Sequence, residues 1–152
     1  MKIIKLTEKY IKDALDLVWT VFEEFESPDY ASEGIEEFRK FIEYNSIMEM
    51  YKKGQITFWG CFDKEDLTGV IAILGEGHIS LLFVKKEYHR RGIARNLFDT
   101  VKKICKGKNI DSISVNSSPY ATEVYHHLGF IDKGQEQTIN GIRFTPMEYL
   151  IN

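Results

Sequence analysis

Cysteine and proline are both scarce in this chain of 152 residues. The two cysteines, Cys61 and Cys105, are too few for a disulfide framework and lack the CxxC spacing of many metal sites. The three prolines come without any glycine- and serine-rich tract that would form a flexible linker. We therefore expect one continuous domain over residues 1–152 and a reduced, cytoplasmic setting.

Long apolar runs and a large excess of charge are also missing. No stretch approaches the roughly 18 apolar residues of a membrane span, and the start, MKIIKLTEKY, lacks the apolar run of a signal peptide. The formal charge of −3 disfavours a general nucleic-acid binder, and 43% hydrophobic residues are too many for a disordered chain. An integral membrane protein and a disulfide-rich secreted domain are not expected.

The sequence contains segments whose apolar residues recur with the spacing of helices and other segments that are typical of strands. Apolar residues recur at spacings of three and four from 11 to 25, after Thr7 as a helix N-cap, which predicts one helical face. Asn140-Gly141 is a strong hairpin signal. In order, the pattern predicts a strand at 3–6, a helix over about 8–26, a second helix with Ser32 as its N-cap, strands at 56–63, 67–75 and 78–84, a helix at 93–106 and a strand at 112–118. A short helix then follows with Pro119 in its first turn and Gly129 just past its end, and strands follow at 130–138 and 142–152.

This order predicts a mixed α/β (α+β) domain with a mostly antiparallel sheet flanked by helices. The crossover from strand 78–84 through helix 93–106 to strand 112–118 requires one parallel pair, whereas the earlier strands are joined by hairpins. A doubly wound nucleotide-binding fold is excluded by those hairpins.

The most informative stretch joins strand 78–84 to the following helix, and it reads HRRGIAR from His89 to Arg95. Small residues at 92 and 94 let an anion approach the backbone, where the first-turn N–H groups and the helix dipole favour negative charge. The alternative is an ordinary strand–helix turn with a solvated basic face. No Gly-Lys-Ser/Thr follows, so a Walker A loop is excluded.

Charge is distributed unevenly along the chain. Residues 85–108 contain nine Lys or Arg against two acids, and residues 13–38 contain nine Asp or Glu and no Lys or Arg. The pattern indicates a small polyanionic ligand at one site and a cationic ligand at another, with simple solubility as the alternative for each block.

Two motifs together resemble those of the GNAT superfamily of N-acetyltransferases. HRRGIA is similar to the family's Q/R-x-x-G-x-G/A motif, with His89 where the family has Gln or Arg, and SSPYATEVYHHLGF resembles its second signature, N-x-x-A-x-x-x-Y followed by LGF. The resemblance implies a GNAT-like fold across essentially the whole chain and acetyl-CoA as the cosubstrate.

The resemblance also implies roles for individual positions. Tyr125 would be the general acid that protonates the departing thiolate, and Asn116 and Ser118 lie at or near the position of the family's asparagine. The pantetheine arm would pair with backbone groups of Leu82, Phe83 and Val84. The pyrophosphate would lie on the amides of Arg90, Arg91, Gly92, Ile93, Ala94 and Arg95.

An amine that attacks a thioester must first lose a proton, because its pKa is about 10.4. The general base stays open among His78, Glu23, Glu24, Glu76 and water. No covalent intermediate is needed, so neither cysteine is assigned as a nucleophile. No metal site is expected, since the adjacent His126 and His127 would point about 100° apart on a helix.

The expected function is therefore acetyl transfer from acetyl-CoA to a primary amine of a small molecule or peptide, without nucleic-acid or membrane partners. Two alternatives are a non-catalytic CoA-binding or regulatory module of the same fold and a nucleic-acid-binding domain that uses the basic stretch. We expect a cationic acceptor to enter beside the first two helices, past Glu23, Glu24 and Glu26. Peptide N-termini, lysine side chains, polyamines, amino acids and aminoglycosides stay open as acceptors, as does the oligomeric state.

Overall fold

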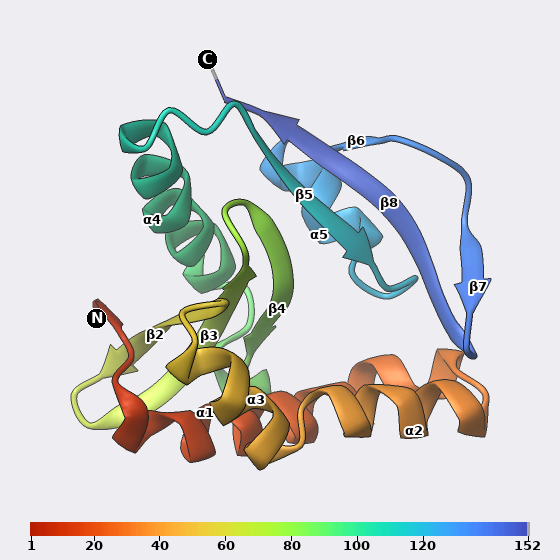
Figure 1. The fold of residues 1–152 in the computed structure, drawn as a ribbon, viewed down its shortest axis with the longest axis horizontal. Coiled ribbons are helices and arrows are strands. Elements are labelled where there is room, and N and C mark those ends of the chain that lie inside the picture. Colours follow the sequence, from red (N-terminus) through yellow and green to blue (C-terminus); the bar gives the residue numbers. More distant parts are fainter. Residues whose placement is uncertain (152) are drawn as a thin grey trace.

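An eight-stranded sheet runs through the molecule in the order β1-β2-β3-β4-β5-β8-β6, with β7 paired to β8 (Figure 1). The computed structural model describes residues 1–151, so Asn152, the last residue of the expected domain and strand, lies outside the described residues. The strands are β1 (Lys2–Lys5), β2 (Ile56–Asp63), β3 (Asp66–Leu74), β4 (His78–Val84), β5 (Ser112–Ser117), β6 (Ile131–Asp132), β7 (Gln137–Ile139) and β8 (Ile142–Leu150).

The predicted mixed sheet is confirmed. Strands β4 and β5 pair in parallel, and the other pairs among the described strands are antiparallel. Helix α4 (Ile93–Gly107) makes the crossover between the parallel strands.

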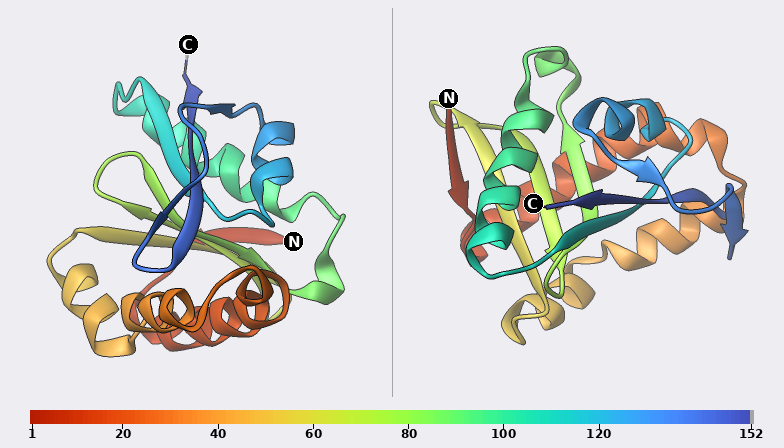
Figure 2. Two further views of the ribbon diagram at one scale, coloured as in Figure 1. Left: turned by 90° about the vertical axis from the view of Figure 1, so that its right-hand side faces the viewer. Right: turned by 90° about the horizontal axis from the view of Figure 1, so that it is seen from above.

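The helices cover the two faces of the sheet separately, which divides the core in two. One face packs against α1 (Glu8–Val21), α2 (Ser32–Phe41) and α3 (Tyr44–Lys52), and the other packs against α4 and α5 (Thr122–Leu128) (Figure 2). Cys105 is free and buried on the apolar face of α4, as its place in the sequence predicted, and Cys61 is also free and buried.

The predicted helix over 8–26 is α-helical only as far as Val21. It continues as a π-helix, η1 (Phe22–Glu26), in which the N–H of Ser27 bonds to the carbonyl of Phe22, and then as a 3-10 turn, η2 (Ser27–Asp29). Pro28 lies in that turn and has no N–H to continue the helix. The wider π-helical turn changes the directions in which the side chains of residues 22–26 point.

The sequence-based prediction missed α3, because its start carries none of the usual capping residues. Glu43 caps it instead, accepting hydrogen bonds from the backbone N–H groups of Asn45 (3.1 Å) and Ser46 (3.0 Å). At α2, Ser32 is the first helical residue and Ala31 is the N-cap, so Ser32 is not the cap that was expected.

The C-terminal part also differs in detail. The predicted strand at 130–138 is divided into two short strands, β6 and β7. The hairpin at Asn140-Gly141 is confirmed, with φ of 53° and 80° as a type I′ turn requires. Helix α5 begins at Thr122, so Pro119 lies in the preceding turn and not in the first helical turn. The helix ends at Gly129 (φ 105°), as predicted.

Candidate active site

Strands β4 and β5 separate soon after they meet, and this opens the sheet. They pair only at His78 with Ser114 and at Ile79 with Val115. Ser80 is an extra residue in β4, because Ile73 pairs with Ile79 while Ala72 pairs with Leu81. Beyond this bulge no strand within residues 1–151 pairs with the β5-facing edge of β4, so its backbone groups can bind a ligand, apart from the Val84 carbonyl, which lies 2.8 Å from His89 Nε2.

A cavity of about 710 Å³ lies in this opening, between the end of β4, the start of α4 and helix α5. Arg91 does not line it, and its guanidinium lies 5.1 Å from the centre of the Tyr88 ring. The residues expected to bind the cosubstrate that do line it are Leu82, Phe83, Val84, Arg90, Gly92, Ile93, Ala94 and Arg95.

The start of α4 is open to an anion. Gly92 is the N-cap with φ of 78°, no side chain caps the helix, and a Cβ at Gly92 would meet nothing within 4 Å. The first-turn N–H groups and the positive end of the helix dipole therefore face the cavity without a competing protein group. Arg95 donates a hydrogen bond to the His127 carbonyl (2.9 Å), which ties α4 to α5 across the cavity.

His89, whose role the sequence left open, braces this turn. Its Nε2 lies 2.8 Å from the carbonyl oxygen of Val84, and its ring packs 5.1 Å from that of Phe25. Phe25 packs in turn 5.3 Å from Tyr120. The three rings link the end of helix η1, the α4 turn and the β5–α5 loop at the edge of the cavity.

A second, smaller cavity of about 220 Å³ adjoins the first. Asn116 and Ser118 line only this one, together with His78. The residues that line both cavities are Glu26, Leu82, Phe83, Ala121 and Tyr125.

Tyr125 therefore lies at the junction of the two cavities. Its ring is buried and packs edge-on against Phe130 at 5.3 Å. Burial, and then the negative charge of Glu26, raise the pKa of the Tyr125 hydroxyl, so this group keeps its proton at neutral pH.

Glu26 is a candidate functional residue that the sequence reasoning placed elsewhere, in the acidic entrance. The structure buries it at the same junction, with only 9% of the residue exposed. Burial raises its pKa to about 7, while the Ser118 side chain lowers this value and Asp29 raises it. A signal was present, because Glu26 follows Phe22 by four residues and so falls on the apolar stripe of the first helix.

Of the four side chains considered as the general base, only His78 lines the smaller cavity. Its Nδ1 lies 2.8 Å from Ser114 Oγ, and burial lowers its pKa. Glu23 and Glu24 are exposed, and Glu24 pairs with Lys86 at 3.0 Å. Glu76 is exposed on the β3–β4 turn and lines a different cavity, beside α4.

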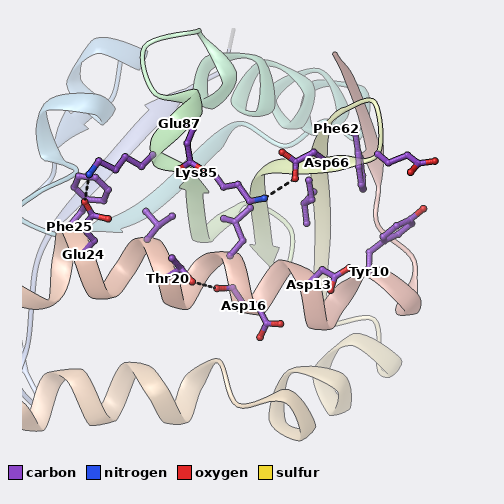
Figure 3. A pocket seen from close by; sticks show the side chains of 15 residues that line it. Tyr10, Asp13, Asp16, Thr20, Glu24, Phe25, Phe62, Asp66, Lys85 and Glu87 are labelled. Atoms are coloured by element: carbon purple, nitrogen blue, oxygen red, sulfur yellow. Dashed lines mark hydrogen bonds and ion pairs between the residues drawn. The ribbon is translucent and has the colours of Figure 1, made fainter.

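Part of the acidic block faces another groove, of about 450 Å³, between α1 and the turns that follow β2 and β4 (Figure 3). Asp13, Asp16 and Glu24 line it, and opposite them Lys85 forms an ion pair with Asp66 at 2.8 Å. The acids at 13–38 are therefore divided between this groove, the exposed helix surfaces and the single buried carboxyl of Glu26.

Residues 1–151 contain no group of three or more His, Cys, Asp or Glu side chains that could hold a metal ion. In the same part of the chain, no helix combines the length and the apolar character that crossing a membrane requires.

Several solved structures share this fold. A GCN5-related N-acetyltransferase from Rhodopseudomonas palustris is 18% identical, with a TM-score of 0.81 over 98% of this chain and 94% of that one. The PaiA N-acetyltransferase of Thermoplasma acidophilum in complex with coenzyme A is 21% identical, with a TM-score of 0.78 over 98% of both chains. An aminoglycoside 6'-N-acetyltransferase complexed with coenzyme A is 14% identical, with a TM-score of 0.68 over 100% and 98%.

No curated protein matches the chain by sequence. A family model does match, however: the acetyltransferase (GNAT) domain, over residues 26–151. This range includes the turn before α4 and all the residues that line both cavities, Tyr125 among them. The chain therefore belongs to the GNAT family of acetyltransferases, which use acetyl-CoA as the acetyl donor.

Proposed function

We propose that the protein is an N-acetyltransferase that moves the acetyl group of acetyl-CoA to a primary amine. The observation that carries this proposal is the position of Tyr125 at the junction of two adjoining cavities. One cavity has the open helix start and free strand edge that suit acetyl-CoA, and the other offers a separate space for an acceptor.

Two features support acetyl-CoA in the larger cavity. The free edge of β4 at Leu82, Phe83 and Val84 can pair with the amides of the pantetheine arm. The turn at 90–95 presents free N–H groups and basic side chains to the pyrophosphate. Asn116 and Ser118, by contrast, border only the smaller cavity, so we place them near the reacting end of the cosubstrate and not beside its pantetheine arm or pyrophosphate.

Acetyl-CoA, when bound, supplies the thioester carbonyl that the amine attacks directly. Tyr125 donates its phenolic proton to the sulfur as the C–S bond breaks. A thiol has a pKa of about 8.5, well below that of a buried tyrosine, so this transfer depends on the closeness of the two groups. The raised pKa has the benefit that Tyr125 is fully protonated before each turnover.

A non-catalytic CoA-binding module would be expected to lack either the tyrosine or the open helix start, and this chain has both.

The family model begins at residue 26, but β1 pairs with β2 and α1 packs on the same sheet. We therefore include residues 1–25 in the same domain as the rest of the chain.

The proposal is tested by incubating the protein with acetyl-CoA and a panel of primary amines while thiol release is followed. We expect release only when an amine is present, together with an N-acetylated product. Intact-protein mass spectrometry after incubation with acetyl-CoA alone should show no acetylated protein. A stoichiometric acetyl-protein would contradict direct attack, and a lack of release with every amine would contradict the activity.

A further inference from the structure

Apolar side chains form the larger part of the lining of the smaller cavity, and its polar part consists of Glu26, His78, Ser80, Asn116 and Ser118. The aromatic and aliphatic side chains come from α2, β3, β4, β8 and the residue after η2, and they include Tyr30, Phe38, Phe41, Leu74, Phe83 and Ile142. An acceptor body that fills this space removes apolar surface from water, which is favourable only if the body itself is apolar. A second ammonium group on the acceptor would find no second carboxylate among the lining residues, and the neutral polar groups there would compensate its desolvation only in part.

The lining of the smaller cavity contains one carboxylate, that of Glu26. Among residues 1–151 it forms no ion pair with any lysine, arginine or histidine. The other titratable groups that line the cavity are uncharged near pH 7, because burial raises the pKa of Tyr30 and Tyr125 and lowers the pKa of His78. The cavity therefore offers one negative charge and no positive one.

The charged groups in the surroundings do not neutralise it. Asp29 on η2 adds negative potential at Glu26. Arg143, on β8, donates to the Glu136 carboxylate (3.0 Å) and to the Asp29 carbonyl (3.1 Å). On the side of the larger cavity, His89 is held by the Val84 carbonyl, and Arg90 is exposed beside Tyr120. A buried carboxylate that has the Ser118 side chain as a hydrogen-bond partner but no cation beside it carries a free-energy cost that a bound cation would relieve.

We infer that the acceptor is a small primary amine with a single ammonium group, which pairs with Glu26, and with an apolar aliphatic or aromatic body. This inference rests on the proposed function, because it names the acceptor class of the same reaction. Polyamines and aminoglycosides, which carry several charges, do not fit one carboxylate in a mostly apolar wall. The volume of about 220 Å³ lies below the roughly 300–1,000 Å³ of most ligand pockets, so the body is small.

The same carboxylate then accepts the proton that the ammonium must lose. The freed nitrogen forms the N–C bond with the acetyl carbonyl, and the C–S bond breaks. The sulfur takes the proton of Tyr125, the second proton of the nitrogen returns to Tyr125, and Glu26 releases its proton to solvent. One ammonium and one thioester thus give one amide, one thiol and one proton.

The acceptor class is tested with a matched pair of amines, n-hexylamine and 1,6-hexanediamine, which differ by a second ammonium group. Spermidine and 2-phenylethylamine extend the series. We expect kcat/KM for hexylamine and 2-phenylethylamine to exceed the values for the diamine and spermidine by about tenfold or more, because the second charge is desolvated without a second carboxylate. Equal or better use of the diamine or spermidine overturns the inference, as does the absence of transfer to both monoamines.

The role of Glu26 is tested with Glu26→Gln, and Glu23→Gln serves as the matched control because Glu23 is exposed and lines neither cavity. In wild type, kcat/KM for hexylamine should rise up to about pH 7, where Glu26 ionises at its raised pKa, and then level off. In Glu26→Gln it should fall by about 10²–10⁴ at pH 8 and keep rising towards the amine pKa of about 10, because only the neutral amine can react. Wild-type rates and profile in Glu26→Gln overturn the inference.

The two proposals fail in different ways. Calorimetric titration with CoA reports on the larger cavity without any acceptor. If CoA binds and the protein acetylates polyamines, the acceptor class is wrong and the N-acetyltransferase proposal stands. If no amine of any class is acetylated, both are wrong.

Discussion

Glu26 and Tyr125 border the same two cavities, and the charge of Glu26 adds to burial in raising the pKa of the Tyr125 hydroxyl. The influence is electrostatic, because a tyrosinate would be a second negative charge beside an ionised carboxylate. Near neutral pH the pair therefore carries at most one negative charge. The arrangement suits a reaction in which one group takes a proton while the other gives one.

The buried carboxyl of Glu26 should destabilise the folded protein as the pH rises. Its pKa is about 7 in the fold against an ordinary 4.5, so the cost is absent below pH 4.5, grows between these values and is complete above pH 7. At about 1.4 kcal/mol per pH unit, the full cost is about 3 kcal/mol. Urea unfolding should show Glu26→Gln to be more stable than wild type at pH 8, with little difference at pH 4.5. Equal stability of the two proteins at pH 8 would mean that Glu26 is not held in a costly charged state.

Gly92 should control CoA affinity. Any side chain there is strained, because φ is 78°, but Gly92→Ala has room for its Cβ, whereas Gly92→Glu adds a negative charge to the phosphate site. We expect calorimetry to show CoA affinity falling by about tenfold or more in Gly92→Glu, beyond any loss in Gly92→Ala, since helix N-termini favour anions. Two variants with the same affinity would show that the pyrophosphate does not lie at this turn.

Tyr125→Phe should separate chemistry from binding. The ring and its packing against Phe130 are kept, and only the hydroxyl is lost. The loss of a general acid typically lowers the rate by about 10²–10⁴, so kcat should fall by this factor while the CoA dissociation constant stays within about twofold of wild type. Full turnover in this variant would leave packing as the function of Tyr125.

The acceptor cavity depends on a contact between two glycines. A Cβ on Gly34, in α2, would lie 2.5 Å from the carbonyl carbon of Gly141 in the β7–β8 turn. The Tyr30 hydroxyl also donates to the Arg143 carbonyl at 3.3 Å, so the hairpin is fastened to η2 and α2. Both Tyr30 and Ile142 line the smaller cavity, so this contact holds in place residues that form its wall.

Gly34→Ala should therefore destabilise the protein by about 1–3 kcal/mol and raise KM for the amine more than the dissociation constant of CoA. Gly107→Ala is the matched control, because a Cβ at this last residue of α4 meets nothing within 4 Å. That control should be neutral or up to about 1 kcal/mol more stable in urea unfolding. An unchanged Gly34→Ala protein would mean that the hairpin moves freely away from α2.

Much of the fold could be predicted because local signals agree with the final structure. The parallel pair follows from the crossover helix, and the β7–β8 hairpin follows from Asn140-Gly141, whose positive φ angles suit only a few residue types. Helix α3 was missed because its cap is a glutamate, Glu43, and the cap preferences do not favour that residue.

The candidate site was predictable only where it depends on the backbone. The open start of α4 follows from Gly92 and its neighbours, since backbone N–H groups at a helix start are free whatever the side chains are. The burial of Glu26 depends on the π-helix at the end of α1, on the nearby Tyr30 and on Ser118 from a distant part of the chain. A count of acids along the sequence could not separate this one buried carboxyl from its exposed neighbours Glu23 and Glu24.

We propose that acetyl transfer from acetyl-CoA to an amine nitrogen takes place at the junction of the two cavities. The most direct measurement combines thiol release with mass spectrometry of the product, with n-hexylamine as acceptor, in wild type and Tyr125→Phe. We predict one N-acetylhexylamine for each thiol released by wild type, and a rate lower by about 10²–10⁴ in the variant. Thiol release without the amide, or equal rates in the two proteins, would contradict the claim.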